Sequence, residues 1–193
     1  MRRLCLLFLL IGTYCYAGER KYTVDSPDGK IQLAIIQTDA GELTYQLSVK
    51  RKQVIDASAL GFKTEDGLTF PFRGWKMGKV TRNKVNSVWK PLWGKRAVVP
   101  DKYNEMKLSF VNEAKSSDAL EVVARAYNEG VAFRYVSPQD AGSALELTTF
   151  NFAGDYTAWF YNGERHNIGP ERLTETDGER LPVMTVKAAD DLY

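Results

Sequence analysis

The stretch "LTYQLSV" (Leu43–Val49) alternates apolar and polar residues without interruption. Its apolar side chains stand at the odd-numbered positions, and Thr44, Gln46 and Ser48 stand between them. Successive side chains of a β-strand point to opposite faces, so this spacing places every apolar group on one side. The stretch therefore predicts a strand that covers a core with one face and meets water with the other.

The same alternation recurs along the chain, in residues 31–35 (IQLAI), 106–110 (MKLSF) and 131–135 (VAFRY). Residues 120–127 (LEVVARAY) could also fit a helix. Their apolar members stand two residues apart, however, and their adjacent valines favour extended backbone. We therefore expect a strand there as well.

Turn signals separate these stretches. Asp-Gly dipeptides, which are typical of tight turns between strands, occur at residues 28–29, 66–67 and 177–178. No segment of ten or more residues carries an apolar stripe with the period of a helix. Many short strands with turns between them predict an all-β fold, a sandwich or a barrel.

The first 17 residues have the pattern of a secretory signal peptide. Arg2 and Arg3 precede the short apolar run of residues 4–12, and residues 15–17 (CYA) form a small-residue cleavage site. The run is too short to span a bilayer, which argues against a membrane anchor, and Tyr14 is a poor neighbour for a lipidated Cys15. We expect cleavage after Ala17 and export to the periplasm or the extracellular space, which leaves residues 18–193 as one domain.

Export changes the charge and the cysteine content of the chain. Arg2 and Arg3 account for the whole net charge of +2, so the remaining domain is neutral and has no electrostatic reason to bind nucleic acid. Both cysteines, Cys5 and Cys15, leave with the leader. With His166 as the only histidine, disulfides, thiol chemistry and an ordinary zinc site are excluded.

The end of the chain reads "VMTVKAADDLY" (residues 183–193). Its first four residues predict a strand, Asp190 and Asp191 a turn, and Leu192 and Tyr193 the start of another apolar segment. A sandwich that stops at this point is expected to be incomplete on its C-terminal side.

Four stretches together resemble a known family. They are residues 26–35 (SPDGKIQLAI), 88–96 (VWKPLWGKR), 103–110 (YNEMKLSF) and 126–135 (AYNEGVAFRY), in that order. The sequence resembles the N-terminal region of glycoside hydrolase family 97 over most of residues 24–193.

This resemblance implies a galactose-mutarotase-like β-super-sandwich that precedes a (β/α)₈ catalytic barrel in exported α-glucosidases and α-galactosidases. It places the catalytic groups in the barrel, together with a calcium ion that takes one carboxylate from the N-terminal domain just beyond a "VMTVKA"-type strand. No matching position exists in this sequence. The resemblance therefore implies no catalytic residue and no metal ligand here, and an α-linked oligosaccharide and the barrel as partners.

The stretch "WFYNGERHNIGPE" (residues 159–171) holds the candidate sugar-binding residues. Sugar rings stack on aromatic faces, and their hydroxyls pair with planar polar groups. The hypothesis is a loop at the rim of a sugar pocket and a domain interface, formed by Trp159, Tyr161, Asn162, Glu164, Arg165 and His166. The alternative places the two aromatic residues in the core.

A catalytic interpretation of the same stretch pairs Glu164 or Glu171 with His166 or Asp155. Glycoside hydrolysis needs two carboxylates about 5 to 10 Å apart, which sequence spacing alone does not establish. A second aromatic stretch, around Trp89 and Trp93, is interpreted either as a sugar platform or, preferably, as core or loop packing.

Three functions follow from these observations. The first is the non-catalytic N-terminal domain of an exported α-glycosidase. The second is a free-standing carbohydrate-binding or structural β-sandwich. The third is a complete small hydrolase, which would need Glu164 or Glu171 for activity.

Overall fold

A computed structural model describes residues 19–65, 67, 69–71, 75–113, 119–137, 142–161, 163, 167–176 and 181–193. Within these ranges the protein is built from β-strands, and the 3₁₀ turn η1 (Leu173–Glu175) is the one helical element among the described residues. The predicted all-β class is confirmed. The leader, residues 1–17, lies outside the described residues.

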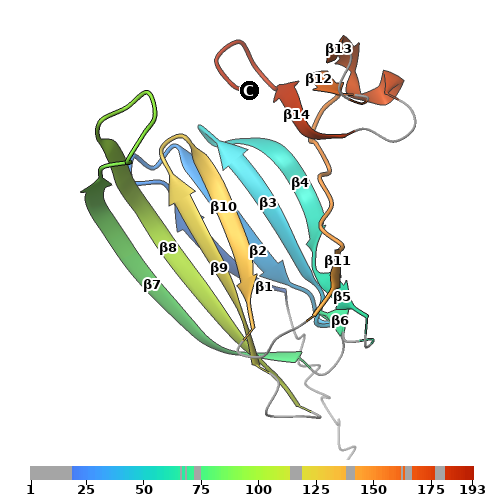
Figure 1. The fold of residues 1–193 in the computed structure, drawn as a ribbon. Helices are drawn as coiled ribbons and strands as arrows, with labels where there is room; N and C mark the ends of the chain where they lie inside the picture. Colours follow the sequence, from blue (N-terminus) through green and yellow to red (C-terminus); the bar gives the residue numbers. More distant parts are fainter. Residues whose placement is uncertain are drawn as a thin grey trace, which may run out of the picture.

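The first sheet is an antiparallel meander of four strands in the order β1-β2-β3-β4 (Figure 1). Its strands are β1 (Arg20–Asp25), β2 (Ile31–Gln37), β3 (Leu43–Val49) and β4 (Lys52–Leu60). The alternation predicted a strand over residues 43–49, and β3 has these bounds. Gly29, in the predicted Asp-Gly turn between β1 and β2, has a φ of +71°, which glycine adopts without strain.

The second sheet has the order β10-β9-β8-β7 and is also antiparallel. Its strands are β7 (Trp75–Trp89), β8 (Val99–Asn112), β9 (Ala119–Tyr127) and β10 (Gly130–Val136). The ambiguous residues 120–127 form β9. Their alternation is explained by Leu120, Val122, Ala124 and Ala126, which are all at most 2% exposed.

The two sheets pack face to face, and their apolar faces form one core. Tyr45 of the first sheet meets Phe133 of the second with ring centroids 5.6 Å apart. Phe70 lies at one end of this core, 5.2 Å from Trp75 and 5.3 Å from Phe110 between ring centroids, in edge-on contacts. Edge-on pairs of this kind add to the stabilisation that burial itself provides.

Two smaller sheets extend the sandwich. One has the order β11-β5-β6 and contains β5 (Phe62–Thr64), β6 (Thr69–Phe70) and β11 (Ala144–Glu146). The other has the order β13-β12-β14 and contains β12 (Thr157–Tyr161), β13 (Asn167–Arg172) and β14 (Leu181–Lys187). Figure 1 shows this second sheet, in orange and red, beside one end of the sandwich.

Both outer strands of the first sheet are covered. Residues 147–153 run along β4, with backbone hydrogen bonds that include Asp56 N–H to the oxygen of Asn151 and Ala153 N–H to the oxygen of Val54. On the other side, the Ser26 N–H donates to the main-chain oxygen of Ile31, so Ser26 and every second residue before it bond to β2. The residues between them, which include Thr23 and Asp25, turn their main-chain groups away from β2.

The outward-turned carbonyls of β1 are capped by side chains of the second sheet. Arg82 donates to the oxygen of Thr23, and Asn104 donates to the oxygen of Asp25 at 2.7 Å. An open strand edge invites pairing with another chain, so these contacts close a site of potential association.

β7 and β8 continue beyond the rest of their sheet. Pairing of β8 with β9 ends at Tyr103, whereas β7 and β8 remain paired as far as Trp89 and Val99. Four residue pairs therefore stand out as a two-stranded projection, roughly 13 Å long at the usual rise per residue. We call residues 86–102 the β7–β8 finger.

The end of the finger exposes its aromatic residues. Trp89 is 54% exposed and Trp93 is 87% exposed. The core half of the preferred interpretation, which was core or loop packing, is therefore wrong, because no second layer of the described residues covers a hairpin that extends past its own sheet.

Candidate functional site

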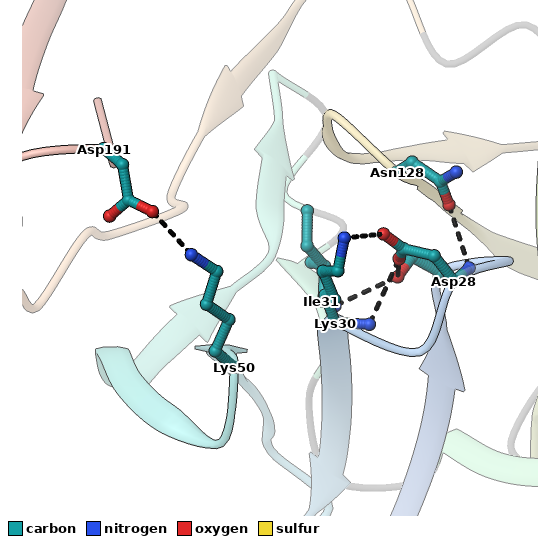
Figure 2. A network of polar contacts seen from close by, with 7 residues as sticks. Asp28, Lys30, Ile31, Lys50, Asn128 and Asp191 are labelled. Carbon is teal, nitrogen blue, oxygen red and sulfur yellow. Dashed lines mark hydrogen bonds and ion pairs between the residues drawn. The ribbon is translucent and has the colours of Figure 1, made fainter.

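A network of polar contacts joins four segments at one end of the sandwich (Figure 2). Asp28, in the β1–β2 turn, accepts hydrogen bonds from the Ser26 hydroxyl at 2.6 Å and from the Lys30 N–H at 3.1 Å. Its own N–H donates to the side-chain oxygen of Asn128 at 3.0 Å, in the turn between β9 and β10. The turn of one sheet is thus attached to the turn of the other.

The charge of Asp28 is stabilised in this arrangement. The Ser26 hydroxyl, the Lys30 N–H and the Lys30 ammonium, 3.1 Å away, together lower the pKa of the Asp28 carboxyl to about 2. Hydrogen bonds to the charged form favour it, so Asp28 is an anion throughout the physiological range.

Lys50 connects this network to the end of the chain. Its N–H donates to the oxygen of Lys30 at 2.6 Å, and its ammonium lies 2.5 Å from the carboxylate of Asp191. Ala188 and Leu192 on either side of that carboxylate pack against the main core. The contacts that attach the C-terminal segment to the sandwich therefore include this ion pair and the apolar contacts of Ala188 and Leu192.

The turn that presents Lys50 is strained. Lys50 and Arg51 have φ angles of +50° and +68°, a conformation that residues with a Cβ seldom adopt. A two-residue turn between β3 and β4 requires it, because this backbone matches the twist of the two strands.

β12 presents the first two predicted sugar-binding residues. Ala158 and Phe160 are at most 1% exposed, so one face of the strand is buried, and Trp159 and Tyr161 point to the other. Tyr161 is 45% exposed, and the Trp159 ring lies 6.5 Å from the ring of Tyr193. Tyr161 therefore lies outside the core, whereas Trp159 is half-buried, and the sugar-binding role of both residues stays a prediction.

The strand after the loop approaches β12 closely. A Cβ on Gly169 would stand 2.5 Å from the oxygen of Ala158 and 3.0 Å from Trp159, and the φ of Gly169 is +117°. Glycine is the residue that fits this position, and its absence of a side chain lets β13 lie against Trp159.

The other four predicted binding residues, Asn162, Glu164, Arg165 and His166, lie outside the described residues. Their neighbours in the chain are placed: Tyr161 pairs with Asn167 across β12 and β13. The structure thus brings Trp159 and Tyr161 to one face, and the remainder of the predicted binding set stays a prediction.

Asp155, a candidate in the catalytic interpretation, holds the backbone of its own segment. It accepts hydrogen bonds from Arg172 at 2.9 Å and from the Thr174 N–H at 3.0 Å. The Thr174 N–H and Arg172 lower the pKa of Asp155, which keeps it ionised. An ionised carboxylate that accepts these bonds does not serve as a general acid.

A polar groove of about 790 Å³ lies between the β1–β2 turn and the second sheet. It is lined by residues 24–29, residues 82–84, Asn104 and Glu105. The two last residues are neighbours on β8 with different surroundings: Asn104 reaches β1, and Glu105, 7% exposed, pairs with Arg125 at 2.8 Å.

A calcium site needs several oxygen ligands gathered in one place. No group of three or more His, Cys, Asp or Glu side chains that could hold an ion occurs in the described part of the chain. The described residues therefore do not fit the calcium ion implied by the resemblance.

No helix within the described ranges is long and apolar enough to cross a membrane.

Comparison with known proteins places this fold. The family model for the N-terminal domain of glycosyl hydrolase 97 matches residues 24–187. The chain belongs to the glycosyl-hydrolase 97 family. The matched region contains the groove, all of β12 and β13, and the network at the end of the sandwich except for Asp191.

Two curated proteins are similar to this chain in sequence. A retaining α-galactosidase of Bacteroides thetaiotaomicron is 22% identical over 91% of this chain and 28% of its own length. A probable retaining α-galactosidase of Streptomyces bingchenggensis is 29% identical over 83% of this chain and 26% of its own length.

Solved structures agree. A family 97 enzyme of Pseudoalteromonas sp., solved in complexes with panose and with acarbose, is 34% identical with a TM-score of 0.64, over 72% of this chain and 22% of that one. A β-arabinopyranosidase follows at 27% identity and a TM-score of 0.62. This chain spans about a quarter of the length of the relatives it matches.

Sequence reasoning missed the polar network. The serine and aspartate of the "SPDGK" turn are a local signal, because such side chains accept or donate hydrogen bonds within their own turn. The contacts of Asp28 with Asn128 and of Lys50 with Asp191 join residues 100 and 141 positions apart, and no local pattern indicates them.

Proposed function

We propose that this chain acts as the non-catalytic N-terminal domain of an exported α-glycosidase of family 97. The observation that carries the proposal is the family match over residues 24–187, combined with the small share of each relative that the chain spans. Most of the length of those relatives lies outside the matched region. In such a protein the domain contributes to the sugar pocket and to the domain interface.

The substrate class proposed is an α-linked oligosaccharide. Two relatives are named α-galactosidases, and a third was solved with panose and with acarbose. The proposed rim of the pocket is the β12–β13 hairpin, with Trp159, Tyr161, Asn162, Glu164, Arg165 and His166. The exposed ring of Tyr161 and the half-buried ring of Trp159 on the same face support this, since sugar rings stack on aromatic faces.

An activity assay separates the proposal from the small-hydrolase alternative. The exported chain alone should release no p-nitrophenol from p-nitrophenyl α-galactoside or α-glucoside. Turnover that disappears on Glu164→Gln or Glu171→Gln would contradict the proposal. A gene without a barrel-encoding region would instead favour a free-standing binding domain.

The role of the hairpin is tested in the longer polypeptide. Trp159→Ala should raise the KM for the oligosaccharide about tenfold, because one stacking contact is lost, with a smaller change in kcat. Phe150→Ala is the matched control, since Phe150 is 61% exposed and lies outside the hairpin. An unchanged KM for Trp159→Ala would show that Trp159 does not contact the sugar.

Export is part of the proposal and has its own test. The mass of the chain recovered from the periplasm or the medium should correspond to a start at Gly18, after cleavage behind Ala17. Recovery of a chain that still begins at Met1 would contradict removal of the leader.

A further inference from the structure

The β7–β8 finger, residues 86–102, combines three properties that the sugar pocket does not explain. It projects beyond its sheet, its end is apolar, and it is basic. In Figure 1 the loop between β7 and β8 lies at the opposite side of the sandwich end from the β12–β14 sheet. The finger is therefore a separate surface from the proposed pocket rim.

The apolar part of the finger is unusually exposed. Leu92 is 100% exposed and Trp93 is 87% exposed, and Val88, Trp89 and Val98 are between 45% and 64% exposed. Large apolar groups gathered on one projecting loop mark a surface that another body covers.

The charge of the finger opposes that of the rest of the domain. Residues 86–102 contain Lys90, Lys95, Arg96 and Lys102 against the single acidic residue Asp101, a net charge of +3. Residues 18–193 as a whole are neutral, so the remainder carries the compensating negative charge. An anionic surface therefore attracts the finger and repels the body, which orients the molecule with the finger forward.

The cations at the end of the finger are directed to solvent. Lys90, Lys95 and Arg96 are exposed, and none of them forms an ion pair with another described residue. Their charge is thus available to a partner, and the partner that fits carries negative charge.

We propose that the finger docks on an anionic lipid bilayer, with Leu92 and Trp93 entering the headgroup region and Lys90, Lys95 and Arg96 meeting the lipid phosphates. Tryptophan prefers the membrane interface, and long basic side chains reach charged headgroups from just below or above it. Valine and leucine decide between a lipid and a glycan. They offer nothing to sugar hydroxyls, whereas the acyl boundary of a bilayer accepts them.

Vesicle binding tests the proposal with the exported chain, isolated after loss of its apolar leader. It should bind vesicles of equal parts phosphatidylglycerol and phosphatidylcholine and not vesicles of phosphatidylcholine alone, and added salt should weaken the binding. Tryptophan emission should shift to shorter wavelength on binding, because Trp89 and Trp93 leave water.

Two variants separate the apolar and the charged contributions. Leu92→Ser with Trp93→Ser, and separately Lys95→Glu with Arg96→Glu, should each weaken binding at least tenfold. Val183→Ser removes an apolar group that is 75% exposed on β14 and should leave binding unchanged. All four substituted residues in the finger are exposed, so an unchanged melting temperature shows that the fold is retained.

Three results would overturn the proposal. The first is no binding to phosphatidylglycerol vesicles at low salt. The second is binding that both finger variants retain, which assigns it to another surface. The third is retention on an anionic polysaccharide matrix that the variants lose, without vesicle binding, which assigns the finger to a glycan.

Discussion

The side-chain amide of Asn104 on β8 donates to the main-chain oxygen of Asp25 on β1 across a distance of 2.7 Å. These residues belong to facing sheets and are 79 positions apart. Because the carbonyl of Asp25 points away from β2, the amide occupies the place that a further strand would take. Arg82 donates in the same way to the main-chain oxygen of Thr23. The two side chains together protect the edge of β1 from pairing with another strand.

Removal of both caps should make the chain associate. We expect Arg82→Ala with Asn104→Ala to lower the free energy of unfolding by about 2 kcal/mol, about 1 kcal/mol for each hydrogen bond. Dimers or larger species should appear in sedimentation velocity. Lys84→Ala, on the same face of β7, is the control and should stay monomeric. A monomeric double variant would show that the edge needs no caps.

Gly169→Ala should destabilise the β12–β13 hairpin. The added methyl group meets the oxygen of Ala158 at 2.5 Å, and the φ of +117° is closed to residues with a Cβ. We expect a loss of about 2 kcal/mol or more in the free energy of unfolding, measured in urea. Gly130→Ala, where no atom lies within 4 Å of the added group, should change it by less than about 0.5 kcal/mol.

Arg51→Gly should stabilise the domain. Arg51 has a φ of +68°, and glycine adopts that angle without the steric cost of about 1 to 2 kcal/mol that other residues pay. Part of this gain is offset because glycine is more flexible in the unfolded chain, so we expect a net increase of about 1 kcal/mol in urea unfolding. Lys52→Gly, in regular strand β4, should have the opposite sign. Equal destabilisation by both changes would show that the turn is not strained.

Asp28 should make the stability depend on acidic pH. Its pKa is about 2 in the folded protein against an ordinary value of 3.8, so the folded state keeps the charge where the unfolded state loses it. The contribution is complete above the ordinary value and is lost as the pH falls toward 2. The melting temperatures of wild type and Asp28→Asn should differ by a constant amount above about pH 5 and converge below pH 4.

The control for this titration is Ser87→Ala, an exposed position outside the network that carries no titratable group. Its difference from wild type should not change with pH. If the difference in melting temperature between wild type and Asp28→Asn stays the same from pH 5 to pH 2, the charge of the Asp28 carboxyl does not contribute to stability.

Alternation predicted the strands that have one face in the core and one in water. Leu43–Val49 is the clearest case, and β9 follows because Ala124 and Ala126 are fully buried. β7 escaped prediction for a physical reason. Its inner face passes beyond the edge of β1, and polar residues such as Arg82 occupy positions that a buried strand would fill with apolar ones.

The candidate site was predicted only in part. Trp159 and Tyr161 were chosen because their residue type suits sugar, and the structure adds that they share one face of β12, opposite the buried Ala158 and Phe160. The attachment of Asp191 to Lys50 depends on where the end of the chain meets the sandwich. Such a contact is a property of the whole fold, and no short stretch of sequence contains it.

The coverage of β4 by residues 147–153 has a consequence for biosynthesis. β4 is complete once residue 60 has left the ribosome, yet the backbone partners of Asp56 and Val54 are made about 90 residues later. During that interval the nascent chain carries a bare hydrogen-bonding edge, which stays open to pairing with other chains until residues 147–153 can cover it.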